Sequence, residues 1–406
     1  MAAFRNIMNV LAPIAFIAGL THLIFQLVTH WSVIAPNSQM IWLAGQSWTI
    51  GASPYQADLA WRPMPGWMPI ASFLSLMDPL LASRVLMVVT TGLMLGASAL
   101  NVSAFYSFKD RTVLVSENKL TDFFRNQSPV TLFFFHASFI ALSQSAAFGL
   151  HLGGAPALVY FGVSLLIWSA VRKRELSGGA SLCILFFVPT VAILIMPALA
   201  LSAYGRRVIA LGVLATFIVS APALAVTPAP DMISAIINSH QSLPEYSTGL
   251  RHFMFLVGAP DLGTIFYTLL ALAVTCAIGL TGRNSNPRLK TIDNLMAALA
   301  VILVIAPLEP AYFLLVGSVL LYGAGLRPPL GAIALLAALL FWRGSNFPGI
   351  PIADINAMAS FYVSIGALTL ALTLLLSSIN APRPSHRSSP HPPAHPMARA
   401  AISRTA

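Results

Sequence analysis

Long apolar runs separated by short polar segments follow one another along nearly the whole chain. Several of these runs approach or exceed the roughly 20 residues that an α-helix needs to cross the hydrocarbon core of a bilayer. The pattern predicts an all-α fold, a polytopic membrane bundle of about 12 helical spans over residues 1–380, some of them short and broken. The spans are predicted at about 8–28, 80–106, 129–147, 155–171, 177–188, 190–203, 208–226, 262–281, 293–306, 311–323, 329–342 and 358–378.

The most informative interruption of this pattern lies between two basic clusters, at 172–174 and 205–207. Basic residues close to the ends of spans favour the cytoplasmic side. A single helix across the roughly 30 residues that separate the clusters would place them on opposite sides of the membrane. Two short helices that meet at Pro189 keep both clusters on one side, because proline ends or kinks a helix. We therefore predict a broken pair of helices here, of the kind that lines a protein-enclosed cavity.

Composition agrees with the membrane class. Hydrophobic residues make up 57% of the chain and charged residues only 8%, whereas soluble domains are about 25% charged. The net charge of +10 comes mostly from short loops placed inside, so it indicates topology rather than nucleic-acid binding. Cys183 and Cys276 lie in apolar runs and are predicted to be small apolar fillers. We expect a multi-pass protein of the bacterial inner (plasma) membrane, with cytoplasmic N- and C-termini.

Two long polar loops, at 30–79 and 227–260, are predicted on the outer side of the membrane. Because the inner loops are short and basic, a functional site is expected on the outer face. The first loop holds Trp42, Trp48, Trp61 and Trp67, which suggest a surface at the level of the lipid headgroups, or an ordinary outer loop with an aromatic belt. The segment 39–48 fits a short interfacial helix with these residues on one side: Met40, Leu43, Ala44 and Ser47.

Common motifs limit the chemistry further. The chain has no G-x-x-x-x-G-K-[ST] phosphate loop, so it is not expected to be an ATPase. It has neither H-E-x-x-H nor C-x-x-C, so we predict no protein-held metal and no cofactor. His136, within the span at 129–147, is expected to make an interhelical hydrogen bond. The tail at 381–406 is rich in Pro, Ser, His and Arg, and we predict that it is disordered and cytoplasmic.

Carboxylates, guanidinium groups and imidazoles occur together on the predicted outer face. A site for a lipid-linked phosphate needs Arg or His to hold the anion and a carboxylate to take a proton from an acceptor hydroxyl. Asp58 and Glu309 are the candidate bases, and a solvated turn residue is the alternative interpretation of Glu309. The candidate anion-binding and substrate-binding residues, for which contact with lipid headgroups is the alternative, are Arg62, His151, His240, Arg251 and His252.

Four segments give the chain a resemblance to a known family. They are a G-A-S-P-Y turn at 51–55 with R-P-M-P at 62–65, the Pro189 break between basic clusters, N-S-H-Q-S at 238–242, and A-P-L-E-P-A-Y at 306–312. In layout the chain resembles the multi-span, polyprenyl-phosphate-sugar-dependent glycosyltransferases of the GT-C class, most closely family 87, from the first span to about residue 320. The resemblance adds candidate substrate-binding residues: Tyr55, Asn238, Ser242 and Tyr312.

The chain departs from this family at its polar positions. Asn37 stands where the family has an acidic residue that serves as general base, and an amide cannot usefully accept a proton near neutral pH. The family's Lys-Pro-Gln is replaced by V-P-T at 188–190, and its hairpin Trp and His are replaced by Pro310 and Tyr312. The resemblance then implies that Asn37 hydrogen-bonds a substrate, while Asp58 or Glu309 accepts the proton.

The resemblance implies a membrane glycosyltransferase. Such an enzyme transfers a sugar, mannosyl- or arabinofuranosyl-like, from a polyprenyl-phosphate donor to an extracytoplasmic glycan or glycolipid acceptor. The expected partners are the polyprenyl-phosphate-linked sugar, this acceptor and membrane lipids, with no nucleic acid. The alternative, favoured by the amide at Asn37, is a non-catalytic relative that binds or moves a lipid-linked saccharide or supports a partner enzyme. An ion-coupled transporter fits less well, because the spans hold few ionisable residues and no inverted repeat is visible.

Overall fold

The computed structural model describes residues 2–56, 64–109, 126–228, 230–231 and 314–326, with positions 291, 292, 294–296, 298, 299 and 302. All regular elements within these residues are helices, which confirms the all-α class for this part of the chain. In chain order they are α1 (Ala2–His30), α2 (Pro36–Thr49), η1 (Pro54–Gln56), η2 (Pro65–Trp67), α3 (Met68–Ser75), α4 (Pro79–Lys109), α6 (Pro129–Ala141), α7 (Gln144–Leu152), α8 (Ala155–Arg172), α9 (Glu175–Leu185), α10 (Pro189–Ala200), α11 (Ala203–Val226) and α16 (Leu315–Leu326). The spans predicted at 262–281, 329–342 and 358–378 and the tail at 381–406 lie outside the described residues.

Four helices of the described part are long and apolar enough to cross a membrane, namely α1, α4, α8 and α11. Helices α6 and α7 pass the same test only together, as a pair bent by 68°. The protein is therefore a membrane-embedded helical protein, as the apolar runs predicted. The bounds of α4 and α11 agree with the spans predicted at 80–106 and 208–226 to within a few residues.

The span predicted at about 129–147 is not one straight helix, because the structure divides this stretch into α6 and α7. Between them, the Ser143 Oγ accepts a hydrogen bond from the Ala146 backbone N–H at 3.1 Å and so caps the start of α7. Three polar residues, Ser143, Gln144 and Ser145, stand at the break, with apolar residues on both sides of them. One capping hydroxyl is enough to begin a new helix in another direction.

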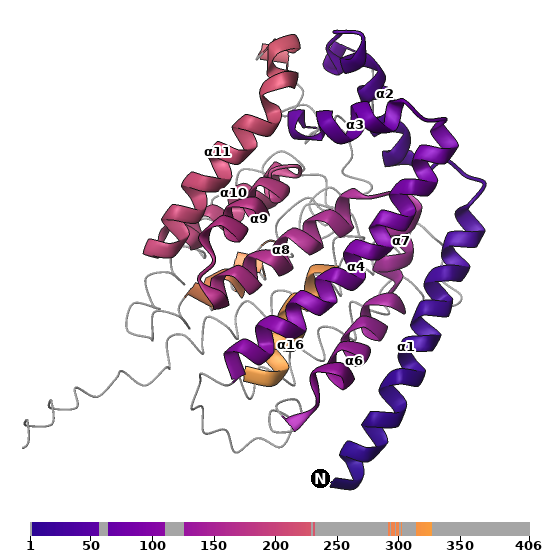
Figure 1. Ribbon diagram of the computed structural model, residues 1–406, viewed down its shortest axis with the longest axis vertical. Coiled ribbons are helices and arrows are strands. Elements are labelled where there is room, and N and C mark those ends of the chain that lie inside the picture. Colours follow the sequence, from indigo (N-terminus) through magenta and orange to yellow (C-terminus); the bar gives the residue numbers. More distant parts are fainter. Residues whose placement is uncertain are drawn as a thin grey trace, which may run out of the picture.

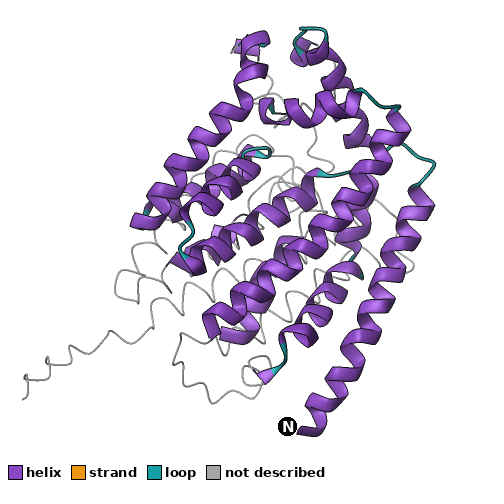
Figure 2. Cartoon of the chain, in the orientation of Figure 1, coloured by secondary structure: helices purple, strands orange, loops and turns teal. Residues whose placement is uncertain are grey.

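The helices lie side by side in the order α11, α9, α8, α4, α6 and α1 (Figure 1). Helix α8 is central, with 72% of its membrane-length window buried, whereas α1 lies at one edge with 17% buried. Ile17, Phe25 and Val28 of α1 remain exposed, as expected for a face in contact with lipid chains. Short loops join most of the described helices (Figure 2).

Helix α16 packs against α4, α6 and α8. The Nε2 atom of the buried His136 lies 2.9 Å from the Gly317 carbonyl oxygen, which confirms the predicted interhelical hydrogen bond. A Cβ atom at Gly317 would lie 2.5 Å from the Ile140 Cδ1, so glycine permits the close approach of α16 to α6.

The predicted broken pair is confirmed as α9 and α10, and Pro189 begins the second helix. A salt bridge joins Arg207 Nη1 and Glu175 Oε1 at 2.9 Å. The Tyr204 hydroxyl also donates to the Arg174 carbonyl oxygen at 3.5 Å. Both basic clusters therefore lie at one end of the bundle, which we call the basic end.

Candidate functional site

A helical cap, formed by α2, η2 and α3, covers the end of the bundle opposite the basic end (Figure 1). Trp67 and Trp48 are each 2% exposed. The Trp67 Nε1 donates to the Phe187 carbonyl oxygen at 3.3 Å, and the Trp48 Nε1 donates to the Thr227 Oγ1 at 3.4 Å. The prediction that these tryptophans lie at the headgroup surface is therefore wrong. They attach the cap to the tip between α9 and α10 and to the end of α11.

Helix α2 forms as predicted, but it buries a different face from the one expected. Its buried apolar side chains include Ile41, Ala44 and Trp48, whereas Met40 and Leu43 are only partly buried. The buried face packs closely on α3. A Cβ atom at Gly45 would lie only 2.0 Å from the Ala71 carbonyl oxygen, so this close contact requires glycine. Contact with a protein neighbour, rather than with lipid, decides the orientation of this helix.

The beginning of α2 offers unpaired hydrogen-bond donors. Its N-cap residue, Ala35, has no side chain to cap the helix, and the Ala35 N–H donates to the Ser83 Oγ at 3.0 Å. The first N–H groups of a helix lack partners within the helix. Asn37 is 8% exposed, and its side chain has no hydrogen-bond partner among the described residues. The neighbouring Ser38 Oγ is also buried and unpartnered within this part of the chain.

A glycine turn between α7 and α8 lies directly against these residues. Gly153 has a φ of +87°, and a Cβ atom there would lie 2.4 Å from the Ser38 Oγ and 3.2 Å from the Ala35 Cβ. Both the backbone conformation and the contact favour glycine at this position. The turn therefore holds the end of α7, with His151, beside the beginning of α2.

Two histidines meet at this end of the bundle. The rings of His30 and His151 lie 5.0 Å apart, and the His30 Nδ1 lies 2.9 Å from the Gln26 carbonyl oxygen. When Nδ1 carries the proton it donates to that carbonyl, which leaves Nε2 available as an acceptor. In the described part of the chain no third His, Cys, Asp or Glu joins the two rings in a possible metal site.

Arg84 brings a permanent positive charge to the same place. The Arg84 Nε donates to the Trp31 carbonyl oxygen at 2.9 Å, and the guanidinium lies 5.1 Å from the centre of the Trp31 ring. Trp31 lies in the linker between α1 and α2, and Arg84 lies near the beginning of α4. We call Asn37, Ser38, His30, His151 and Arg84 the α2 N-terminal site.

The structure brings together two of the predicted site residues and separates a third. Asn37 and His151 both lie in the α2 N-terminal site. Tyr55 follows the other end of α2, and a helix of 14 residues is about 20 Å long. Tyr55 is buried, and burial raises the pKa of its phenol, so it stays neutral. The remaining predicted site residues lie outside the described part, and their roles stay predictions: Asp58, Arg62, Asn238, His240, Ser242, Arg251, His252, Glu309 and Tyr312.

The sequence interpretation missed Ser38, His30 and Arg84. Arg84 carried a usable signal, because an ionisable residue within an apolar run is costly and usually has a partner or a role. Ser38 and His30 carried none, because serine is common in loops and a histidine at a helix end is ordinary.

Chemically, the α2 N-terminal site is rich in donors. It contains helix N–H groups, a hydroxyl, an amide and a guanidinium, all of which suit an anion. The described part of the chain holds three side-chain carboxylates. Asp78 caps α4 through its Oδ1, which accepts from the Leu80 N–H at 2.9 Å, Glu175 pairs with Arg207 at the basic end, and Asp231 follows the end of α11. The described residues of the site thus offer groups that suit an anion and include no carboxylate.

The chain was compared with protein-family models and with curated proteins, and neither comparison finds a match. The resemblance to the GT-C class therefore stays a prediction.

Proposed function

We propose that this protein binds a polyprenyl-phosphate-linked sugar at the α2 N-terminal site and transfers the sugar to an extracytoplasmic glycan or glycolipid. The observation that carries the proposal is the Ser38 Oγ, which is buried and has no hydrogen-bond partner among the described residues, next to the mostly buried Asn37. An unpaired buried polar group costs roughly 1–3 kcal/mol. A phosphate at the N-terminus of α2 would satisfy both groups and lie beside Arg84 and the two histidines.

In the proposed reaction, the acceptor hydroxyl oxygen forms a bond to C1 of the sugar. The bond between C1 and the phosphate oxygen breaks, and polyprenyl phosphate leaves with the bonding electrons. The hydroxyl proton passes to a carboxylate, for which we propose Asp58 or Glu309. Asn37 donates a hydrogen bond from its amide and takes no proton. Arg84 and the N–H groups of α2 stabilise the negative charge that develops on the phosphate.

We propose a GT-C-like bundle of about 12 spans, with both termini cytoplasmic, in the bacterial plasma membrane. Two observations support this arrangement. The basic clusters gather at one end of the bundle, as cytoplasmic segments do. The α2 N-terminal site lies near the opposite end, where an extracytoplasmic acceptor has access.

Binding of radiolabelled polyprenyl-phosphate sugars to the protein in nanodiscs tests this proposal. We expect Asn37→Ala and Ser38→Ala each to weaken donor binding about tenfold, the effect of one hydrogen bond to a charged group. Because Ser38 Oγ has no partner in the described part of the chain, Ser38→Ala should leave the thermal midpoint unchanged. Gln46→Ala, an exposed position on the same helix, is the matched control and should bind donor normally. Unchanged donor affinity in both Asn37→Ala and Ser38→Ala would contradict the proposed site.

The transfer step is tested separately with Asp58→Asn and Glu309→Gln. One of them should abolish sugar transfer while donor binding remains. If both variants transfer normally, neither residue is the base.

A second candidate function, binding of the lipid-linked saccharide without transfer, is favoured by one observation. The α2 N-terminal site holds Asn37, whose amide cannot act as a base. Donor binding without transfer across a broad acceptor panel would establish this function. Transfer gained in Asn37→Asp would then show that the amide at this position is what prevents the reaction.

A further inference from the structure

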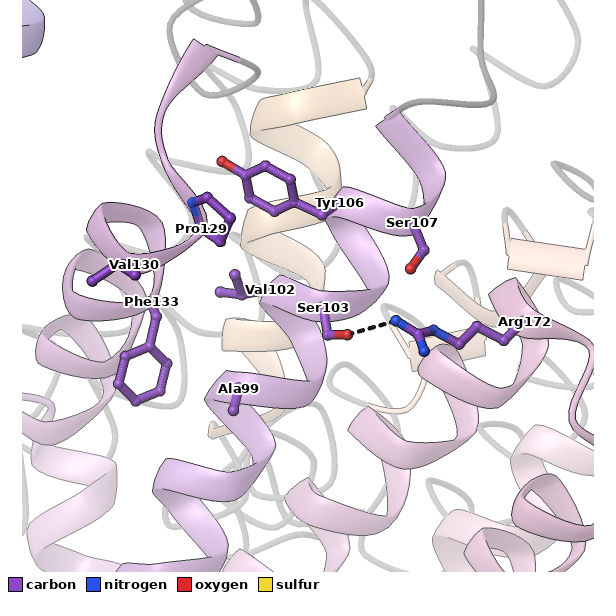
Figure 3. Close-up of a pocket in the computed structure, with 9 residues that line it drawn as sticks. All are labelled: Ala99, Val102, Ser103, Tyr106, Ser107, Pro129, Val130, Phe133 and Arg172. Atoms are coloured by element: carbon purple, nitrogen blue, oxygen red, sulfur yellow. Dashed lines mark hydrogen bonds between the residues drawn. The ribbon is translucent and has the colours of Figure 1, made fainter.

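A pocket lies at the basic end of the bundle, between α4, α6 and α8 (Figure 3). Its volume is about 480 Å³, which falls within the range of about 300–1,000 Å³ typical of small-molecule sites. The nine lining residues are Ala99, Val102, Ser103, Tyr106, Ser107, Pro129, Val130, Phe133 and Arg172. None of them takes part in the function proposed above.

The pocket has an apolar side and a polar side. Val102 of α4 faces Val130 and Phe133 of α6, while Ser107 and Arg172 lie across the pocket from them (Figure 3). This division matches an amphipathic molecule that has an apolar chain joined to a charged head.

Arg172 supplies the charge, and the structure holds its side chain in place. Its Nη2 donates to the Ser103 Oγ at 3.1 Å, and its guanidinium lies 4.8 Å from the centre of the Trp168 ring. The Trp168 Nε1 also donates to the Ser103 Oγ, at 3.2 Å. No carboxylate pairs with Arg172 among the described residues, where Arg207–Glu175 is the salt bridge found. A guanidinium has five N–H donors, so most of them remain available to an anion.

The surrounding charge favours an anionic head. The stretch from 172 to 207 contains five basic residues and one acid, which is Glu175. Each Lys or Arg near a membrane surface attracts anionic lipid with about 1 kcal/mol. A phosphate oxyanion can bind a guanidinium in a bidentate geometry. Zwitterionic lipids also have this phosphate, but they carry no net negative charge.

We propose that this pocket binds one anionic glycerophospholipid from the leaflet at the basic end, with its phosphate on Arg172 and an acyl chain against Val102, Val130 and Phe133. The site is separate from the α2 N-terminal site, because 19 residues of α4, about 28 Å of helix, divide Arg84 from Ser103. A lipid here would bridge α4, α6 and α8 at the end where α6 begins.

Native mass spectrometry of the full-length purified protein, titrated with phosphatidylglycerol or phosphatidylcholine, tests the proposal. We expect one phosphatidylglycerol to bind about fivefold more tightly than phosphatidylcholine, because one Lys or Arg attracts a lipid of net negative charge with about 1 kcal/mol and the choline cation cancels that charge. Arg172→Gln should abolish this preference. Arg206→Gln removes the same charge at the same end of the bundle but lies outside the pocket, and it should keep the preference.

A second pair of variants tests the apolar wall. Ala99→Phe fills the pocket from an exposed position of α4 and should weaken phosphatidylglycerol binding about tenfold, within the range for loss of buried apolar contact. Val88→Phe adds similar bulk to an exposed position three turns away and should have no effect. Glycerol phosphate, which has the head without the chains, should bind far more weakly than the lipid.

Three results would overturn the proposal: equal affinity for the two lipids, equal losses in Arg172→Gln and Arg206→Gln, or equal binding of glycerol phosphate and the lipid. Arg172 is exposed, so its substitution should leave the fold intact, and the test stands on this variant even if Ala99→Phe fails to fold.

Discussion

Buried polar side chains are the residues whose roles the structure defines most sharply. The Asn101 Nδ2 of α4 lies within hydrogen-bond distance of three hydroxyl oxygens: Tyr160 at 3.3 Å, Ser164 at 3.0 Å and Ser318 at 3.2 Å. Asn101 is 4% exposed, so it joins α4, α8 and α16 in the interior. Thr90, on the same helix, is fully buried, but its hydroxyl has no partner in the described part of the chain.

We expect Asn101→Leu to lower the free energy of unfolding by about 1–2 kcal/mol, the upper range for interhelical hydrogen bonds in membranes. Thr90→Val removes an unpaired hydroxyl with little change of shape, so it should be neutral or stabilising. Thermal unfolding of both variants in nanodiscs checks this. A larger loss in Thr90→Val than in Asn101→Leu would show that the network contributes little to stability.

At this scale the sequence predicted some residues of the candidate site and not others. Asn37 and His151 were predictable as polar residues beside apolar runs, in segments placed outside. Their proximity was not, because it depends on Gly153 meeting Ser38 across two separate helices. His136 was predictable as a hydrogen-bonded residue, but its partner, the Gly317 carbonyl, belongs to a helix far away in the chain.

Among the elements, the cap and the pair α9–α10 depend on each other. The tip between α9 and α10 interrupts regular backbone, which leaves carbonyl groups that need partners. The Trp67 Nε1 bonds the Phe187 carbonyl there, and the two rings lie 5.2 Å apart. Proline and basic clusters predicted this pair correctly, since both signals are local in the sequence. The division of 129–147 into α6 and α7 was not predicted, although the polar residues Ser143, Gln144 and Ser145 mark it in the sequence.

Trp67→Phe tests the attachment between the cap and the tip. The substitution leaves the buried Phe187 carbonyl without this donor, which costs roughly 1–3 kcal/mol. Trp42→Phe is the matched control, because the Trp42 Nε1 donates to the Met77 carbonyl at 2.9 Å in a part-buried place that water can reach. Thermal midpoints should fall clearly more for Trp67→Phe. Equal shifts of the thermal midpoint would mean that the hydrogen bond at the tip contributes no more to stability than the bond made by Trp42.

For the whole molecule, composition alone was enough to predict the membrane class, since 57% hydrophobic and 8% charged residues leave no soluble alternative. The arrangement of the helices needed tertiary contacts. The 2.9 Å salt bridge between Arg207 and Glu175 requires that the chain enter and leave α9–α10 at one end of the bundle. A single membrane-crossing helix in place of α9 and α10 would put every later loop on the opposite side of the membrane. The pair therefore determines the direction in which α11 crosses.

Cysteine labelling in whole cells tests this topology. In a chain with Cys183→Ala and Cys276→Ala, we expect Ser32→Cys, an exposed position between α1 and α2, to react with a membrane-impermeant maleimide in intact cells. Lys173→Cys and Arg206→Cys should react only after permeabilisation, because both basic clusters lie at the end assigned to the cytoplasm. Opposite behaviour of the Lys173 and Arg206 positions would contradict the paired arrangement of α9 and α10. Reversal of all three positions would keep that arrangement and overturn the orientation, and with it the extracytoplasmic placement of the α2 N-terminal site.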